Sequence, residues 1–145
     1  MDELVLNKLE VARLDKLVEN RPLAAAAKTA GAYTITIADI LNGIIRMDPE
    51  AARDFTLPLA TLAVAGVSGA KVGDSIDFHV INLGTAGVDE TITLVTAAGA
   101  NLIGFMDVEN SATTHDAFSV GSSMFRLQFT NVTSGSEAYD LIRLA

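Results

Sequence analysis

Apolar and polar side chains alternate most regularly near the C-terminus of the chain. Between residues 125 and 130 the odd positions are large and apolar and the even positions are polar, with apolar side chains at Phe125, Leu127 and Phe129. Successive side chains of a strand point to opposite faces, so this pattern predicts a half-buried strand. Residues 133–136 (Thr-Ser-Gly-Ser) favour a turn, and the alternation resumes at Tyr139 and Leu141. We therefore predict a terminal β-hairpin.

Five further apolar-rich runs, separated by Gly, Asp and Asn, precede the hairpin. With the two strands of the hairpin, the expected strands are residues 33–37, 44–47, 75–82, 91–96, 102–105, 122–130 and 139–144. Seven short strands with short connections are typical of an all-β domain. The predicted fold class is mainly β, an antiparallel β-sandwich or barrel.

Two short helices are expected within this domain. Residues 38–41 can form one helical turn, and residues 58–64 have Pro58 in the first turn and Gly66 just past the end, the usual asymmetry of a helix. The second helix is apolar nearly all round. We expect it to be largely buried, with neighbouring protomers as one possible source of cover.

The N-terminal segment has a different character. Residues 1–21 hold nine of the 28 charged residues, and their heptad-like apolar stripe predicts an amphipathic helix, with Leu4, Val11, Leu14 and Val18 on one side. Asn7 interrupts the stripe, which argues against a simple two-stranded coiled coil, and Pro22 ends the helix. Two interpretations stay open, a helix packed on its own domain and an arm docked on other chains.

Residues 23–31 are rich in alanine and form a linker or a short helix before the strands begin. The resulting division is an N-terminal helical arm and linker over residues 1–31 and a compact β domain over residues 32–145. A chain of 145 residues fits one domain, but with 50% hydrophobic and only 19% charged residues a single core hides the apolar surplus with difficulty. Composition therefore favours an oligomer or a large docking surface.

Charge and segment types exclude several function classes. The formal net charge of −8 repels a phosphate backbone, so a nucleic-acid partner is not expected. No run of 18 apolar residues is present for a transmembrane helix, and the charges after Met1 exclude a secretory signal with an uninterrupted apolar core. We expect the mature protein to start at or near Met1. The absence of cysteine excludes disulfides, thiolate zinc sites and a cysteine nucleophile.

Few residues have a pattern that favours chemistry. Asp77 and His79 lie on the same side of the expected strand 75–82 and could share a metal ion or an acid/base task, but no third ligand is nearby, and two solvent-facing polar side chains explain the pattern better. His115 stands in a polar loop, residues 107–116, whose oxygen donors do not have the spacing of a calcium loop.

Other signatures of enzymes are missing as well. The glycine-rich residues 65–73 lack the order of a phosphate loop, and no Gly-x-Ser-x-Gly motif occurs. We therefore predict no catalytic, cofactor-binding or metal-binding residues and no cofactor, and a protein that is not an enzyme.

Several short motifs carry a resemblance to a known family. The strongest is Phe125-Arg-Leu-x-Phe-Thr-Asn-Val-Thr-Ser-Gly-Ser-Glu-Ala138, and shorter pieces fall at residues 33–36 (Tyr-Thr-Ile-Thr), 40–46 (Ile-Leu-Asn-Gly-Ile-Ile-Arg), 56–58 (Thr-Leu-Pro) and 72–78 (Val-Gly-Asp-Ser-Ile-Asp-Phe). Together they resemble the small structural proteins of tailed-bacteriophage virions, among them the head decoration or cement proteins. The resemblance begins at Tyr33 and does not include residues 1–32.

The resemblance implies a compact β domain that forms a homo-oligomer, most often a homotrimer, on the outside of a phage capsid. It implies the major capsid protein as the partner, with neither nucleic acid nor membrane, and a location on the virion surface after synthesis in the host cytoplasm. The alternative is a phage tail or receptor-binding module that binds carbohydrate. Such a module needs an exposed aromatic platform, for which the chain offers no tryptophan and only Tyr33 and Tyr139 as tyrosines.

Overall fold

The structure is a computed structural model that describes residues 27–28, 31–84, 90–110 and 121–145. The predicted amphipathic helix of residues 1–21 and the loop residue His115 lie outside these described residues. Ala27–Lys28 form a strand, β1, within the segment that the sequence suggested as a linker. The sheet therefore begins before residue 32.

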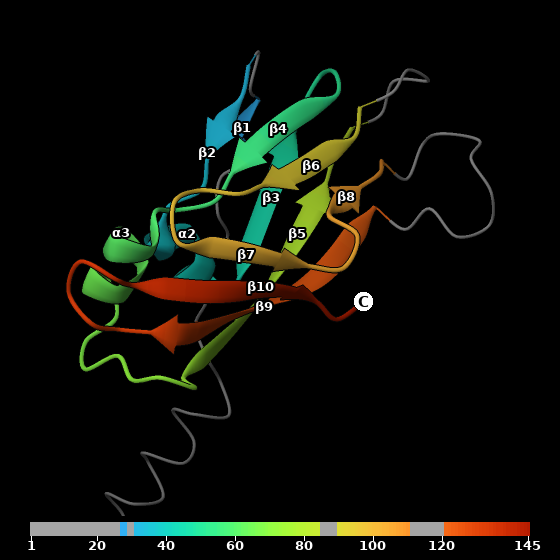
Figure 1. Cartoon of the computed structure of the whole chain (residues 1–145). Helices are drawn as coiled ribbons and strands as arrows, with labels where there is room; N and C mark the ends of the chain where they lie inside the picture. Colours follow the sequence, from blue (N-terminus) through green and yellow to red (C-terminus); the bar gives the residue numbers. More distant parts are fainter. Residues whose placement is uncertain (1–26, 29–30, 85–89, 111–120) are drawn as a thin grey trace, which may run out of the picture.

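Within the described ranges, ten strands form two sheets that lie as separate layers (Figure 1). The six-stranded sheet has the order β1, β3 (Ile44–Asp48), β5 (Ser75–Asn82), β9 (Ser122–Asn131), β10 (Ala138–Arg143), β7 (Ala100–Ile103). The four-stranded sheet has the order β2 (Tyr33–Thr34), β4 (Arg53–Thr56), β6 (Ile92–Val95), β8 (Asp107–Val108). This arrangement confirms the prediction of a mainly β, sandwich-like fold, and the sheets do not close into a barrel.

Both sheets are mixed, which the sequence pattern did not reveal. From β1 to β9 the chain alternates between the two sheets, so successive strands of one sheet are separated by a strand of the other. The intervening strand carries the chain back across the sandwich, which allows the next strand to run in the same direction as the previous one. The pairs β1/β3, β3/β5, β7/β10, β2/β4 and β4/β6 are parallel, whereas β5/β9, β9/β10 and β6/β8 have the antiparallel pairing that we expected.

The C-terminal hairpin forms as predicted. β9 and β10 pair in antiparallel register, with Leu127 opposite Leu141 and Phe129 opposite Tyr139. These four side chains are buried, and Phe125 is buried with them. Asn131 Oδ1 accepts a hydrogen bond from the Thr133 backbone N–H at 2.9 Å and so begins the turn. The alternation of apolar and polar residues therefore identified the inner and outer faces of both strands.

The core lies between the two sheets. Its largest side chains are Tyr139, Phe55, Phe78, Phe125 and Phe129. The Tyr139 hydroxyl donates a hydrogen bond of 2.6 Å to the carbonyl oxygen of Pro58, and burial raises the pKa of this phenol. The bond connects β10 to the segment that leads into the second helix. It gives a partner to both buried polar groups, the Tyr139 hydroxyl and the Pro58 carbonyl.

Two short helices connect strands, close to the predicted positions. α2 (Ile37–Asn42) begins at Thr36 with a capping box, because Thr36 Oγ1 accepts from the Asp39 N–H and the Asp39 carboxylate accepts from the Thr36 N–H. α3 (Ala60–Ala65) ends at Gly66. The expectation that this helix is largely buried is wrong within the chain itself. Ala60 and Ala63 are buried, but Leu59 just before the helix and Leu62 within it are exposed, because a helix at the end of a sandwich meets the core with only one side.

Candidate functional site

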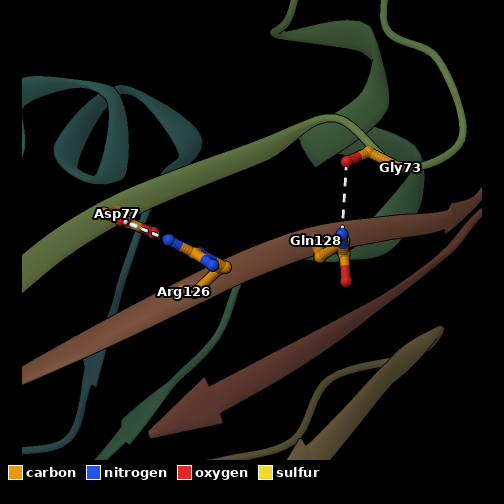
Figure 2. Close-up of polar contacts among 4 residues, drawn as sticks. All are labelled: Gly73, Asp77, Arg126 and Gln128. Atoms are coloured by element: carbon orange, nitrogen blue, oxygen red, sulfur yellow. Dashed lines mark hydrogen bonds and ion pairs between the residues drawn. The ribbon is translucent and has the colours of Figure 1, made fainter. Parts of the chain in front are cut away.

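Asp77 lies on the outer face of the six-stranded sheet, where it forms an ion pair with Arg126. The two residues are directly opposite in the β5/β9 ladder, and the guanidinium is bidentate, with Arg126 Nε 2.7 Å from Asp77 Oδ1 and a terminal nitrogen 2.8 Å from Oδ2 (Figure 2). The hydrogen bond from Arg126 holds the pKa of the Asp77 carboxyl below its usual range, and the carboxylate raises the pKa of Arg126. Asp77 therefore has a cation as its partner on the neighbouring strand.

His79 has the surroundings of a solvent-facing residue. It is exposed, on the same face as Asp77, and its neighbours in the ladder are Ile44 of β3 and Met124 of β9. No group of three or more His, Cys, Asp or Glu that could hold a metal ion occurs within the described ranges. The metal or acid/base pairing of Asp77 with His79, which the sequence offered as the less favoured alternative, has no third ligand among the described residues, and the direct partner of Asp77 is Arg126. His115 lies outside the described residues.

The glycine-rich segment before β5 is a turn held by β9. The Gly73 N–H donates to the Phe129 carbonyl at 2.8 Å. Gln128 Nε2 donates to the Gly73 carbonyl at 3.2 Å (Figure 2). Gly73 has a φ of 92°, a conformation that favours glycine. Within the turn, the Lys71 N–H donates to Asp74 Oδ2 at 2.9 Å. These contacts give the segment a structural role at the start of β5.

A buried polar cluster was not found by sequence reasoning. Asn82 Nδ2 donates to the carbonyl oxygens of Glu90 and Val108 at 2.7 and 2.9 Å, and its Oδ1 accepts from the Gly84 N–H at 2.9 Å. Asn110 Nδ2 lies 3.3 Å from Glu90 Oε2. The side chains of Asn82, Glu90 and Asn110 are all buried. The cluster joins β5 of one sheet to β8 of the other, and its only sequence signal is a polar residue at an inward position of a strand.

Arg143 closes the sandwich near the chain end. Its guanidinium donates to the carbonyl oxygens of Phe105 and Asp107 at 3.0 and 2.6 Å and to the Ser123 hydroxyl at 2.7 Å. The same group lies 5.7 Å from the ring centroid of Phe105 and 5.9 Å from that of Phe125. A planar guanidinium with five donors can donate to three oxygens and also stack near two rings. Arg143, on β10, therefore contacts both the chain around β8 and the strand β9.

One surface feature is an apolar region that we call the helical end. It consists of the exposed side chains Leu41 (49% exposed), Leu59 (44%), Leu62 (58%) and Val72 (63%), on and around α2 and α3. The end of α3 lies close to the start of α2, because a Cβ added to Gly66 would clash with the Ile37 side chain. Residues 55–70 contain no charged side chain. Exposed leucines in uncharged surroundings are typical of a surface that contacts another protein.

Comparisons with protein-family models, with curated proteins and with solved structures found no match. Among the described residues, no helix has the length and hydropathy needed to cross a membrane.

Proposed function

We propose that this protein is a structural virion protein, a capsid decoration or cement protein that binds the outside of a tailed-phage head as a homo-oligomer, with a trimer as the expected form. The sequence motifs between residues 33 and 138 support the family assignment. The observation that carries the proposal in structural terms is the helical end, since a cement protein works through surfaces that become buried against other chains.

The helical end has the chemistry that such a contact requires. Each buried Å² of apolar surface stabilises a complex by about 25 cal/mol, and standard protein interfaces bury roughly 1,600 Å² in total. The chain has a formal net charge of −8, so two copies repel one another where carboxylates would meet. Contact through Leu59 and Leu62 brings together surfaces without charge and avoids this repulsion. The helical end is therefore the favoured contact between copies.

The mechanism of the proposed function is mechanical. Hydrogen bonds of Arg143 and of the Asn82 cluster connect the two layers of the β fold. An oligomer of such domains that touches several major capsid subunits holds those subunits in place against the pressure of packaged DNA, and its several contacts act together through avidity. This function uses no catalytic residue, cofactor, nucleic acid or membrane, and it places the protein on the capsid surface after synthesis in the host cytoplasm.

A carbohydrate-binding receptor or tail module is the second candidate. Neither tyrosine offers the platform that it needs, because Tyr139 is buried and the Tyr33 ring packs on Phe55 with the centroids 5.5 Å apart. Phe105, 64% exposed, is the observation that favours this candidate. The Arg143 guanidinium lies over the Phe105 ring, however, which leaves at most one face of the ring for a sugar.

The oligomer is tested by size-exclusion chromatography with light scattering on the wild-type chain, on Leu62→Glu and on Ser122→Glu. Ser122 is exposed at the start of β9, whereas the other end of this strand, at Phe129, contacts the segment next to Val72 of the helical end, so the Ser122 variant adds the same charge away from α3. We expect the wild type and Ser122→Glu to have three times the 15.2 kDa chain mass and Leu62→Glu to dissociate. A monodisperse wild-type monomer at micromolar concentration contradicts the oligomer.

The location is tested separately, by mass spectrometry of purified virions. The proposal expects the protein in a fixed copy number relative to the major capsid protein. Its absence from virions, or a copy number of only a few per particle, contradicts the role as a cement protein and favours the tail module.

A further inference from the structure

A second apolar surface lies on the outer face of the six-stranded sheet, which points away from the core. We call it the outer quartet; its members are Met124 on β9, Ile142 and Leu144 on and after β10, and Ile103 on β7. Ile142 and Ile103 are register partners, and the Leu144 N–H donates to the Met124 carbonyl at 2.9 Å. Side chains two apart on one strand share a face, so the four residues form one continuous surface.

The outer quartet is not covered by the described part of the chain. Ile103 and Leu144 are each 42% exposed, and Met124 and Ile142 are half-buried. None of the four belongs to the core or packs against it. Polar residues border the quartet on the same face. Asp77 is paired to Arg126, which lies opposite Ile142; Asp140 is bonded to Asn101 at 2.9 Å; and the exposed His79 lies opposite Met124. The quartet is thus an apolar surface with a polar border.

The start of the described chain indicates what covers this surface. Residues 1–26 precede β1, which is the far edge strand of the same sheet. Neighbouring strands are about 4.8 Å apart, so β1 and β10 are separated by four intervals, or about 19 Å. Ala27 lies opposite Met47, which is three residues, or about 10 Å, along the strands from the level of Met124 and Leu144, so the distance from Ala27 to Leu144 is about 22 Å. Residues 19–26 can span up to about 26 Å when extended, which is enough to bring residue 18 to this part of the quartet.

The sequence of that segment suits the surface. Residues 1–18 contain eight leucine and valine side chains, among them Val11, Leu14 and Val18 at a spacing that puts them on one side of a helix. Attachment to β1 also keeps the segment at a high effective concentration near its own sheet, which favours this sheet over that of a second copy.

We infer that residues 4–18 lie across the outer face of the six-stranded sheet of their own chain and cover the outer quartet with their apolar side chains. The inference is independent of the proposed function, because it concerns a contact within one chain. It leaves the helical end free for other copies.

Cross-linking tests the contact directly, because the chain contains no natural cysteine. Leu14→Cys is combined with Ile142→Cys in the full-length protein and treated with a short bismaleimide linker. The matched control combines Leu14→Cys with Asp54→Cys, an exposed position on β4 of the other sheet. We expect a link within one chain for the Ile142 pair, identified by peptide mass spectrometry, that forms at least about tenfold faster than in the control.

Two cross-linking results overturn the inference. Equal rates in the two pairs mean that the segment does not lie over the quartet. A link that joins two chains, seen as a doubled mass on a denaturing gel, means that the segment covers a second copy.

A second measurement tests the contact if the linker does not react with both thiols. Alkylation of the single variant Ile142→Cys should be slow in the full chain and should become at least about tenfold faster when Leu14→Glu and Leu17→Glu are added. Alkylation of Asp54→Cys should not respond to those two changes. If the Ile142→Cys rate is unaffected by them, the inference is wrong, whatever the oligomeric state of the protein.

Discussion

The buried hydroxyl of Tyr139 makes a prediction that can be worked out in detail. The side chain has no exposed surface, and its O–H donates to the Pro58 carbonyl at 2.6 Å. Tyr139→Phe keeps the ring but leaves that carbonyl without this donor. The loss of a buried hydrogen bond that leaves one polar group unsatisfied costs about 1 to 3 kcal/mol of unfolding free energy. With a urea dependence of about 1 to 3 kcal/mol per M, the unfolding midpoint should fall by about 1 M.

The pH dependence of this difference provides a sharper test. Burial raises the pKa of Tyr139 above its ordinary value of 10.0. Above pH 10, the unfolded chain loses the phenol proton while the native chain keeps it, so the unfolding free energy of the wild type falls with rising pH, by up to about 1.4 kcal/mol per pH unit. Phenylalanine does not titrate. The stability difference between the wild type and Tyr139→Phe should therefore be constant below pH 9 and shrink above pH 10.

Urea titrations followed by circular dichroism at pH 7, 9, 10 and 11 measure this difference. Tyr33→Phe is the control, because the Tyr33 ring is only half-buried and its hydroxyl donates at 3.1 Å to an Asp39 carboxylate that keeps two bonds from Thr36. Its effect at pH 7 should be the smaller of the two. A Tyr139→Phe variant as stable as the wild type at pH 7 would refute the hydrogen-bond argument, and a difference unchanged up to pH 11 would refute the argument from burial.

Three further predictions concern stability, each measured by the same titrations. Phe129→Ala should cost about 3 to 5 kcal/mol because it leaves a cavity in the core, whereas Gln128→Ala on the opposite face should cost much less; equal losses would show that the two faces of β9 are misassigned. Gly99→Ala should be far more destabilising than Gly135→Ala, since both positions have φ above +80° but only at Gly99 would the new Cβ clash, with Ala60 Cβ and the Glu137 carbonyl oxygen; similar losses would contradict this close packing. Asp77→Asn should reduce the loss of unfolding free energy at acid pH. Arg126 lowers the pKa of Asp77 in the folded state, so the carboxylate contributes stability above its ordinary pKa, and this contribution is lost as pH falls through the folded-state value. The same dependence of stability on pH in Asp77→Asn and in the wild type would mean that the Arg126 pair contributes nothing.

The sequence predicted the strands whose side chains alternate, and it missed those that are too short to show a period. β5 has the bounds that the pattern indicated, β9 extends one residue further at its end, and β10 begins and ends one residue earlier than predicted. β4 was missed because its four residues include Arg53 and Asp54 beside a single buried phenylalanine. β1 and β8 have two residues each, too few for an alternation of apolar and polar side chains to be detected. The pairing of strands is set by contacts between distant segments, so local alternation carried no information on the parallel pairs.

The candidate surfaces were predictable only in part. The apolar composition of α3 was plain in the sequence, but the exposure of Leu62 depends on where the helix sits relative to the sheets. The solvent-facing interpretation of His79 agrees with its exposure. Its neighbour Asp77 takes Arg126 as a partner from a strand 49 residues away, a choice that depends on the β5/β9 register. The outer quartet is likewise assembled from three strands and has no signature within any one of them.

The alternation of the chain between the two sheets has a consequence for how the protein folds. β9 and β10 are the only described strands that are both consecutive in the chain and paired, so their hairpin is the one strand pair that forms by closing a short loop. Every other pair joins segments separated by at least one strand of the opposite sheet, as with Ile44 and His79, and loses more chain entropy before any contact compensates for it. The two sheets also depend on each other, because every described connection from β1 to β9 runs from one sheet to the other. A topology with so many non-local pairs is expected to fold slowly, and the β9/β10 hairpin is the pair whose loop closure costs the least chain entropy.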